Sequence, residues 1–402
     1  MQIENVIYKM HELVIRNAQN LLMEHLSIFP AVAILGPRQC GKSTLARMVS
    51  GHLPNFLYLD LQDRVDLAKL NEPELFFQYN RHSTICLDEV QQLPDIFSVL
   101  RSEIDKDRRK GRFILLGSAS RELIQKSSET LAGRIGYIEL TPFISDELDA
   151  ENLFDLKKYW YRGGYPESYL TQNDYTSALW RENFIRTYVE RDIPQLGFNI
   201  SAKLLTRMLI MTAHGHGQIF NASGIGQSLG VTHPTVKRYL DIFEQTFFLR
   251  VLPPFEKNTR KRLVKSPKVY VRDSGLLHQL LQISDFNALM GHPVYGSSWE
   301  GMVIENICSS LPMARFSFYR SAVGEEIDLI VEAKGKLLAV ECKASPAPQL
   351  TKEFLKALEF IKPHKCFVVA PVTRPYTLHK EVQVCGINHI VRELRSALNS
   401  DN

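Results

Sequence analysis

Residues 36 to 43 read Gly-Pro-Arg-Gln-Cys-Gly-Lys-Ser, an order of residue types that binds phosphate. The segment follows the apolar run at 31–35 and precedes a helix-forming stretch that starts at Thr44. Glycines between a strand and a helix let successive backbone N–H groups converge, while Lys42 adds charge and Ser43 a magnesium-ligating hydroxyl. The pattern predicts a nucleoside triphosphate site. The residues expected to bind the nucleotide are Gly36, Pro37, Arg38, Gln39, Cys40, Gly41, Lys42, Ser43 and Thr44.

Two acids, Asp88 and Glu89, end the apolar run that begins at Ser83. Such a run is typical of a buried strand in a parallel sheet, and ligands bind at the carboxyl edge of these sheets. We expect Asp88 to hold magnesium through Ser43 or through water. Glu89 is then the base that polarises the water attacking the γ-phosphate.

Three further residues are candidates for contact with the γ-phosphate. Ser118 follows the strand-like run 112–117 and is expected to sense the phosphate by a hydrogen bond. Arg134 opens the run 134–140 and is a candidate arginine finger for its own or a neighbouring subunit, with Arg121 as a second candidate. The competing interpretation is that both arginines are solvated.

The elements that must position these residues are strands alternating with helices. Residues 56–60 form a further strand and residues 96–104 a helix, which together predict a layered α/β domain over residues 1–148.

Several phrases of the sequence resemble the AAA-type ATPases of bacteria and archaea that carry a C-terminal domain of unknown function. They are GPRQCGKST, LDEVQQLPDIF, GRFILLGSAS, LAGRIGYIELTPF, YWYRGGYPESYL, YVERDI and LPPFEKNTRKRLVKSPKVYVRDSGLL. The resemblance implies a magnesium-dependent ATP hydrolase that forms oligomers. Cys40 stands where a small apolar residue is usual in these proteins, so we expect nucleotide binding to be sensitive to oxidation.

The middle of the chain is expected to hold a helical lid or linker over 149–203 and a winged helix-turn-helix over 204–265. Helices are predicted at 204–213, after an N-cap at Ser223, and from Thr232 onward, with Gly230 as the turn. The apolar stripe of the last helix comprises Val236, Leu240, Phe243 and Phe247, and it leaves His233, Lys237 and Arg238 on the opposite side.

A basic run over residues 257–272, from Lys257 to Arg272, contains seven basic residues and no acid. A basic wing beside Lys237 and Arg238 predicts a surface that contacts DNA phosphates. The alternative is that the winged helix serves only as a protein-interaction or lid module.

The last segment, 266–402, contains two alternating runs that flank Lys334 and Gly335. If these two residues form the hairpin loop, Asp328 lies opposite Glu341 and Glu326 opposite Lys343. Two carboxylates opposite each other repel, and a divalent metal ion would remove the conflict. The other face is predicted to be core and comprises Ile327, Leu329, Val331, Leu338, Val340 and Cys342.

An Asp followed about a dozen residues later by Glu-x-Lys resembles the PD-(D/E)xK nuclease core. The resemblance implies that Asp328 and Glu341 hold magnesium, that Glu300 on an upstream helix adds an acid, and that Lys343 positions water or stabilises charge. Degenerate domains of this type bind without cutting, so both outcomes stay open. A further helix at 356–360 and a strand at 365–370 are in the order that this fold requires.

Composition sets the general class of the protein. The 402 residues are 45% hydrophobic, which is enough apolar material for several globular domains. The net charge of +4 is too small to decide for or against a nucleic-acid partner. Six cysteines without a C-x-x-C pair favour reduced, buried thiols and a cytoplasmic location, and we expect no membrane span.

Three functions are compatible with these patterns. The first is an ATPase that acts on DNA or is regulated by it. The second is a nucleotide-controlled switch that binds a protein partner and carries an inactive nuclease-like domain. The third is a metal-dependent nuclease regulated by ATP.

Overall fold

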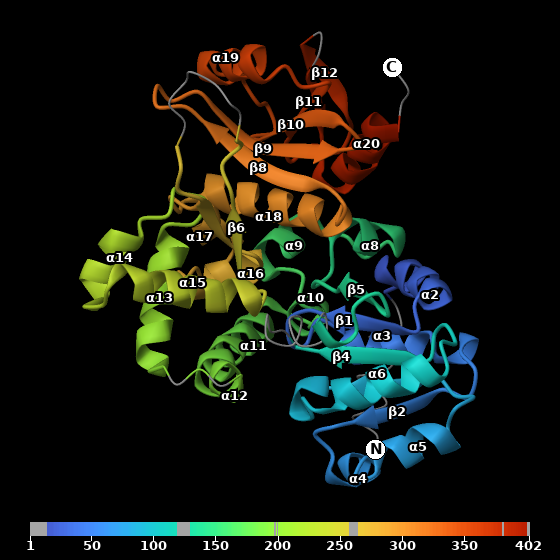
Figure 1. Cartoon of the computed structure of the whole chain (residues 1–402). Helices are drawn as coiled ribbons and strands as arrows, with labels where there is room; N and C mark the ends of the chain where they lie inside the picture. Colours follow the sequence, from blue (N-terminus) through green and yellow to red (C-terminus); the bar gives the residue numbers. More distant parts are fainter. Residues whose placement is uncertain are drawn as a thin grey trace. The chain divides into compact units, whose positions relative to one another are not determined.

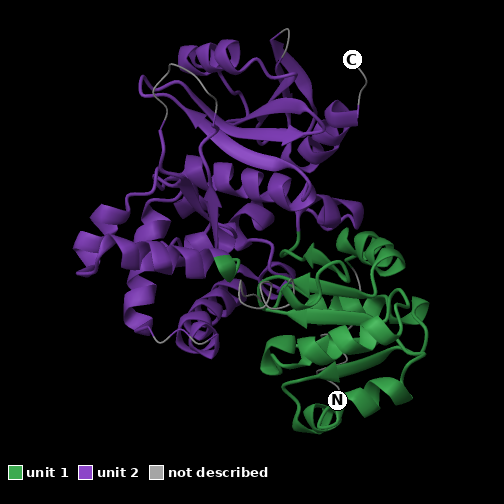
Figure 2. Cartoon of the chain, in the orientation of Figure 1, with its two compact units in different colours: residues 1–143, 245–247 green, residues 144–244, 248–402 purple. Residues whose placement is uncertain are grey.

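The chain folds into two compact units. The computed structural model describes residues 14–118, 129–196, 198, 200–256, 264–379 and 382–399. The first unit comprises Met1–Phe143 with Gln245–Phe247, and the second comprises Ile144–Glu244 with Phe248–Asn402 (Figure 2).

A five-stranded sheet of order β2-β3-β4-β1-β5 organises the first unit, and all of its neighbouring strands are parallel (Figure 1). The strands are β1 (Ala31–Leu35), β2 (Leu57–Asp60), β3 (Ile85–Asp88), β4 (Phe113–Gly117) and β5 (Ile135–Glu139). Each predicted strand of this region is therefore confirmed. The parallel order brings the carboxyl ends of β1, β3 and β4 to one edge, because parallel neighbours end on the same side.

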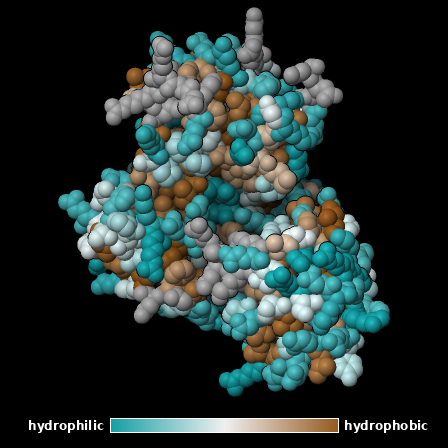
Figure 3. Space-filling model, viewed as in Figure 1, coloured by the Kyte–Doolittle hydropathy of each residue, from teal (hydrophilic) through white to brown (hydrophobic). Residues whose placement is uncertain are grey.

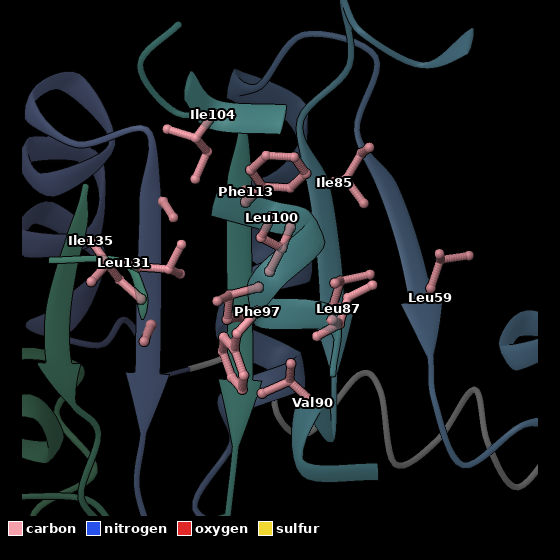
Figure 4. Close-up of a cluster of buried hydrophobic side chains, with 14 of the residues drawn as sticks. Leu59, Ile85, Leu87, Val90, Phe97, Leu100, Ile104, Phe113, Leu131 and Ile135 are labelled. Carbon is pink, nitrogen blue, oxygen red and sulfur yellow. The ribbon is translucent and has the colours of Figure 1, made fainter. Parts of the chain in front are cut away.

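Both faces of this sheet are buried, which explains why its strands read as continuous apolar runs. Alternate residues of β1 belong to two core clusters, with Ala33 on one face and Val32 on the other. Phe97, Leu100 and Ile104 of α6 cover the first face, with Leu100 and Ile104 beside Phe113 (Figure 4). The opposite face packs against α2 and α3. The helices of the unit are α2 (Ala18–Ile28), α3 (Lys42–Met48), α4 (Arg64–Ala68), α5 (Pro73–Tyr79) and α6 (Ile96–Lys106).

The second unit begins with a helical region, as predicted for residues 149–203. Its helices are α8 (Ser145–Ala150), α9 (Leu156–Arg162), α10 (Pro166–Leu170), α11 (Asp174–Thr187) and α12 (Ile193–Gln195), with a π-helical turn at Tyr188–Asp192. The turn at Gly163 and Gly164, after α9, packs against the N-terminus of α16 (Ser274–Leu280). Asp273 caps α16 and also accepts the N–H of Gly164 at 2.8 Å, and a Cβ on Gly163 would overlap its carboxylate.

Three helices and a two-stranded sheet follow in the order expected of a winged helix. They are α13 (Ala202–His214), α14 (Ala222–Leu229), α15 (His233–Gln245), β6 (Leu249–Leu252) and β7 (Lys268–Val271). Gly230 ends α14 with φ 68°, as the turn required. Two predictions of detail are wrong: Asn221, not Ser223, caps α14, and α15 ends before Phe247, which belongs to the first unit. β7 lies beyond residue 265, so the sheet crosses the boundary predicted there.

A six-stranded sheet of order β12-β13-β11-β10-β9-β8 forms the rest of the second unit. α19 lies on one side of this sheet, and α18 and α20 lie on the other (Figure 1). The remaining elements are α17 (Phe286–Met290), α18 (Tyr295–Ser310), β8 (Arg315–Arg320), β9 (Glu326–Ala333), β10 (Lys336–Cys342), α19 (Lys352–Ile361), β11 (Lys365–Val369), β12 (Tyr376–His379), β13 (Val382–Cys385) and α20 (Ile387–Asn399).

The hairpin of β9 and β10 has the predicted register. Ala333 pairs with Lys336, and the pairing continues to Leu329 and Val340. Lys334 and Gly335 form the turn with φ 51° and 73°, the left-handed conformation that a two-residue loop of this type needs.

The predicted core face of this hairpin is confirmed for five of its six residues, which are fully buried, but the opposite face is buried as well. Ile330 and Ala339, which alternate with the predicted core residues, are fully buried against Phe354 of α19. Cys342, which we placed in the core, is only half-buried. Helices cover both faces of the sheet, so alternation along the strands does not separate core from solvent.

On the face drawn in Figure 3, hydrophilic and apolar residues are intermixed. The most exposed large hydrophobic residues, such as Met313 at 95%, come from different elements. No helix among the described ranges is both long and apolar enough to cross a membrane. The six cysteines are free thiols, and five of them are buried.

Candidate nucleotide site and a second carboxylate cluster

The phosphate loop connects β1 to α3 in a curved conformation. Gln39 and Gly41 have φ 59° and 99°, and Gly41 immediately precedes α3, so the loop turns sharply into the helix. Lys42 is buried, and its Nζ donates to the carbonyl oxygens of Gly36 at 3.0 Å and Pro37 at 2.8 Å. The ammonium group is therefore held across the loop where phosphate is expected. Of the other predicted contacts, Arg38, Ser43 and Thr44 are half-buried and Gln39 is exposed.

Arg16, which the sequence did not indicate, supports this loop from outside. Its guanidinium donates to the carbonyl oxygen of Cys40 at 2.9 Å and to that of Thr141 at 2.6 Å. Gly36 packs so closely against the chain after β5 that a Cβ would overlap the carbonyl oxygen of Leu140. The end of β5 and the loop are thus locked together.

Asp88 lies beside the loop at the end of β3 and is 4% exposed. The hydroxyl of Ser43 donates to its Oδ2 at 2.5 Å, and the hydroxyl of Tyr58 donates to the same oxygen. Burial and the neighbouring carboxylate raise the pKa of Tyr58, which keeps the phenol protonated as a donor. Tyr58 is a second residue that sequence reasoning missed. It lies on the neighbouring strand two residues before Asp60, which pairs with Asp88, and this position is a signal of proximity.

Glu89 and Ser118, the candidate base and the candidate sensor, contact each other. Ser118 Oγ donates to Glu89 Oε2 at 3.1 Å, and the amide of Gln91 donates to Ser118 Oγ at 3.2 Å and to Glu89. Glu89 has φ 52°, an uncommon left-handed conformation for a residue with a side chain. The amide of Gln91 and the Ser118 hydroxyl therefore hold the candidate base in one orientation.

Ser43 and Asp88 fit a magnesium ion that binds together with a nucleotide. Hydroxyl and carboxylate oxygens are its preferred ligands, and in nucleotide sites it uses one or two protein ligands together with phosphates. The 2.5 Å contact shows that these two oxygens converge at the edge of the sheet.

Arg134 is not at the nucleotide site of its own chain, which corrects one of the predictions. β5 runs parallel to β1, and the carbonyl of Arg134 accepts the N–H of Ala31 at the amino edge of the sheet. The five residues of β1 separate this edge from the loop by roughly 16 Å. The guanidinium pairs with Asp105 at 2.8 Å. A role toward a neighbouring subunit stays a prediction, and Arg121 lies outside the described residues.

Cys40 does not have the surroundings of a reactive thiol. Its side chain is fully buried, Sγ donates to the carbonyl of Leu140 at 3.3 Å, and burial raises its pKa. Thiols react as thiolates, so both inaccessibility and the raised pKa argue against the predicted sensitivity to oxidation.

The acids of the C-terminal hairpin form a second cluster, in the second unit. Lys343 donates to Glu341 Oε1 at 2.7 Å, and Asp328 Oδ2 accepts the N–H of Cys342 at 2.9 Å. Burial followed by the charge of Asp328 raises the pKa of Glu300 to about 7 and that of Glu341 to about 8. Glu300, Asp328 and Glu341 are therefore near one another, as predicted.

Lys268 occupies the centre of this cluster, which the sequence did not indicate. Its Nζ lies 2.9 Å from Glu300, 2.8 Å from Glu326 and 3.8 Å from Asp328. Burial alone would lower the pKa of Lys268, but these three carboxylates raise it above its usual value. The signal in the sequence was its place at the start of the apolar run Lys-Val-Tyr-Val, which is typical of a buried strand.

This arrangement does not fit the predicted divalent ion. An ion ligated by the same oxygen of Glu300 would lie within about 5 Å of the Lys268 ammonium. At an effective dielectric constant of about 20, the repulsion is roughly 6 kcal/mol. Among the residues that the structure describes, no group of three or more His, Cys, Asp and Glu side chains is placed to hold a metal ion.

Part of the predicted DNA surface is buried. Lys268 takes part in the carboxylate cluster, and Arg272 pairs with Glu305 at 2.6 Å. Glu305 also binds Arg250, and although burial alone would raise its pKa, the two arginines lower it to about 2. These basic residues are therefore not available to phosphate. Lys237 and Arg238 are exposed on α15, as predicted, and residues 257–263 lie outside the described ranges.

The fold and site of the first unit define an AAA-type ATPase domain. Residues 29–148 match the family model described as an AAA domain. Residues 153–287 and 295–390 match two domains of unknown function, DUF8612 and DUF4143.

Two mycobacterial proteins are similar over most of the chain. They are the uncharacterised proteins Rv2008c of Mycobacterium tuberculosis and Mb2031c of Mycobacterium bovis, each 36% identical over 376 residues, which is 94% of this chain and 84% of theirs. The chain belongs to their family. Among solved structures, the Walker-type ATPase PABY2304 of Pyrococcus abyssi is 14% identical with a TM-score of 0.45, covering 66% of this chain and 95% of that one.

Proposed function

We propose that the protein binds ATP with magnesium at the phosphate loop and hydrolyses it. The observation that carries this proposal is the convergence of Ser43 and Asp88 at the carboxyl edge of the sheet, beside Lys42 and Glu89. Magnesium, when bound, would neutralise charge that develops on the phosphates.

Each residue of the site has a distinct role in this proposal. Lys42 moves from the loop carbonyls to the phosphates, and Ser43 with Asp88 holds the ion. Glu89 orients and deprotonates the attacking water, since its carboxylate is held by Ser118 rather than by a cation. Ser118 reports on the γ-phosphate because it can exchange its bond to Glu89 for one to phosphate.

Variants at Lys42 and Glu89 test the proposal. Lys42→Ala is expected to abolish ATP binding, measured by titration with a fluorescent ATP analogue. Glu89→Gln is expected to bind ATP within about threefold of wild type and to lose at least about 100-fold in turnover, measured by phosphate release. Retained turnover in Glu89→Gln would refute its role as the base, and ATP binding by Lys42→Ala would refute the site.

We further infer that DNA acts on this ATPase through α15. The support is the pair of exposed basic residues Lys237 and Arg238 on the second helix of a helix-turn-helix arrangement. Lys268 and Arg272 are buried and do not contribute to DNA binding, so the proposed DNA-binding surface is smaller than the one predicted from the sequence. The alternative, a nucleotide-controlled switch that binds a protein, requires no DNA affinity.

Salt dependence separates these two functions. ATPase activity is expected to rise when duplex DNA is added at low salt, and the rise is expected to disappear as salt increases. The double variant Lys237→Gln/Arg238→Gln is expected to lose the stimulation. Lys203→Gln/Arg207→Gln removes the same charge from exposed positions on α13 and serves as the matched control. No stimulation of the wild type would favour the switch.

A further inference from the structure

The main chain of Lys268 is held in place from both sides. The residue is the first of β7, where it pairs with Leu252 of β6 and forms a bridge with Ile219. Pairing on two sides fixes the direction of its Cα–Cβ bond. The side chain is therefore directed by the small sheet toward the carboxylates of α18 and β9.

The ammonium group of Lys268 is buried. The residue is 2% exposed, and Nζ contacts Glu300 and Glu326 at hydrogen-bond distance while lying 5.6 Å from the centre of the Phe318 ring. Tyr270 Oη donates to the same oxygen of Glu300 at 2.5 Å. These contacts surround one buried positive charge, although the Glu326 side chain is 29% exposed.

The carboxylates of this cluster need a positive charge beside them, and Lys268 supplies it. Lys343 is engaged by Glu341, and Arg320 reaches Glu326 only at 3.7 Å. Lys268 is the ion-pair partner of Glu300 at 2.9 Å and of Asp328 at 3.8 Å, and the charge of Lys343 also acts on Asp328. Glu341 Oε2 is buried and has no hydrogen-bond partner among the residues that the structure describes.

We propose that Lys268 is the resident cation of the cluster of Glu300, Glu326 and Asp328 and takes the place of a divalent metal ion. The acids of the nuclease-like hairpin then form an ion cluster without a metal ion, and this cluster connects β7 to α18 and β9. The proposal is independent of the ATPase function, because it concerns residues of the second unit and requires no nucleotide.

Manganese binding to the nucleotide-free full chain tests this directly, with free Mn²⁺ followed by electron paramagnetic resonance. Wild type and Asp328→Asn are expected to bind Mn²⁺ alike. Lys268→Gln is expected to gain one Mn²⁺ per chain with at least tenfold tighter affinity than wild type, and Lys268→Gln/Asp328→Asn is expected to lose that gain. Lys352→Gln removes an exposed charge at the start of α19 and is expected to gain nothing.

Thermal melting is a second measurement, which reports the stability of the protein and does not depend on nuclease activity. Lys268→Gln is expected to melt at a lower temperature than wild type, since it leaves carboxylates unpaired, and Mn²⁺ is expected to restore part of the loss. Mn²⁺ is expected to leave the melting of wild type unchanged.

The wild-type comparison keeps the proposal testable even if Lys268→Gln does not fold. Mn²⁺ binding by wild type that Asp328→Asn abolishes would overturn the proposal, because it would place a divalent ion beside Lys268. A folded Lys268→Gln that binds no more Mn²⁺ than wild type would also overturn it.

Discussion

At the scale of single residues, the same side chain type has different roles in different surroundings. Lys42 lies in a loop where it can exchange carbonyl partners for phosphate, whereas Lys268 is enclosed by carboxylates. Cys40 lies in the phosphate loop, yet its buried thiol has a raised pKa. Residue type alone therefore does not identify the reactive groups of this chain.

Tyr58 provides a prediction at this scale. Its hydroxyl and that of Ser43 donate to one oxygen of Asp88, so the two together fix the rotation of the carboxylate. A hydrogen bond to a charged group contributes about 1.5–3 kcal/mol. We expect Tyr58→Phe to raise the magnesium concentration needed for half-maximal ATPase activity by roughly tenfold or more.

The control for this prediction is Tyr79→Phe, which removes the same hydroxyl from a side chain that is 87% exposed. It is expected to leave the magnesium dependence unchanged. An unaltered magnesium requirement in Tyr58→Phe would mean that Ser43 and the backbone N–H of Glu89 suffice to orient Asp88.

At the scale of elements, the contacts between strands and loops explain features that local sequence leaves open. β5 contributes to the nucleotide site through its end, because Leu140 follows it and accepts the Cys40 thiol. Its beginning, with Arg134, lies at the far edge. The direction of a strand thus decides which of its ends takes part in the chemistry.

Gly36→Ala tests the contact between the loop and β5. A Cβ at Gly36 would overlap the carbonyl oxygen of Leu140, so the loop must move away from the strand end. Overpacking of this kind costs about 1–3 kcal/mol. We expect ATP affinity, titrated with a fluorescent analogue, to fall at least tenfold. Gly51→Ala has open space around its Cβ and is expected to bind as wild type does; equal affinities of the two variants would contradict this account.

At the scale of the whole molecule, the two units differ in their spectroscopic reporters. The three tryptophans of the chain, Trp160, Trp180 and Trp299, all belong to the second unit. Their fluorescence therefore reports the unfolding of that unit separately from the ATPase domain.

Acid is expected to destabilise the second unit through two buried histidines. His278 Nδ1 lies 3.0 Å from the carbonyl oxygen of Tyr161, to which it donates, and Nε2 lies 2.7 Å from the Ser298 hydroxyl. His216 accepts the N–H of Val271. Burial lowers the pKa of both to about 3.

The sign of the effect follows from these pKa values. In the unfolded chain a histidine takes up a proton below about pH 6.5, whereas the folded rings stay neutral down to about pH 3. We expect the unfolding free energy to fall as pH decreases through this window, by about 1.4 kcal/mol per pH unit for each histidine. Urea denaturation followed by tryptophan fluorescence at several pH values measures it.

His278→Gln is expected to reduce the dependence of the unfolding free energy on pH by about the contribution of one proton. His233→Gln, at an exposed position on α15, is expected to leave this dependence unchanged. A slope that is unaffected by His278→Gln would show that other groups cause the loss of stability in acid.

Much of the fold was predictable because its signals are local. The strands of the first unit are apolar runs bounded by turns, and their positions are confirmed within one or two residues. The register of β9 and β10 followed from a two-residue turn and a period of two. The predicted core face of that hairpin is buried, but the burial of its other face was not predicted, because alternation alone does not reveal that helices cover both faces of the sheet.

The sequence by itself determined the phosphate loop, because strand, turn and helix are contiguous and their geometry is set by neighbouring residues. Only the tertiary structure decided which side chains meet it. Tyr58 and Arg16 reach the site from elsewhere in the chain, and Arg134 is carried to the opposite edge. Lys268 joins acids from α18 and β9 for the same reason: contacts between distant residues depend on strand order and packing, which a local pattern does not contain.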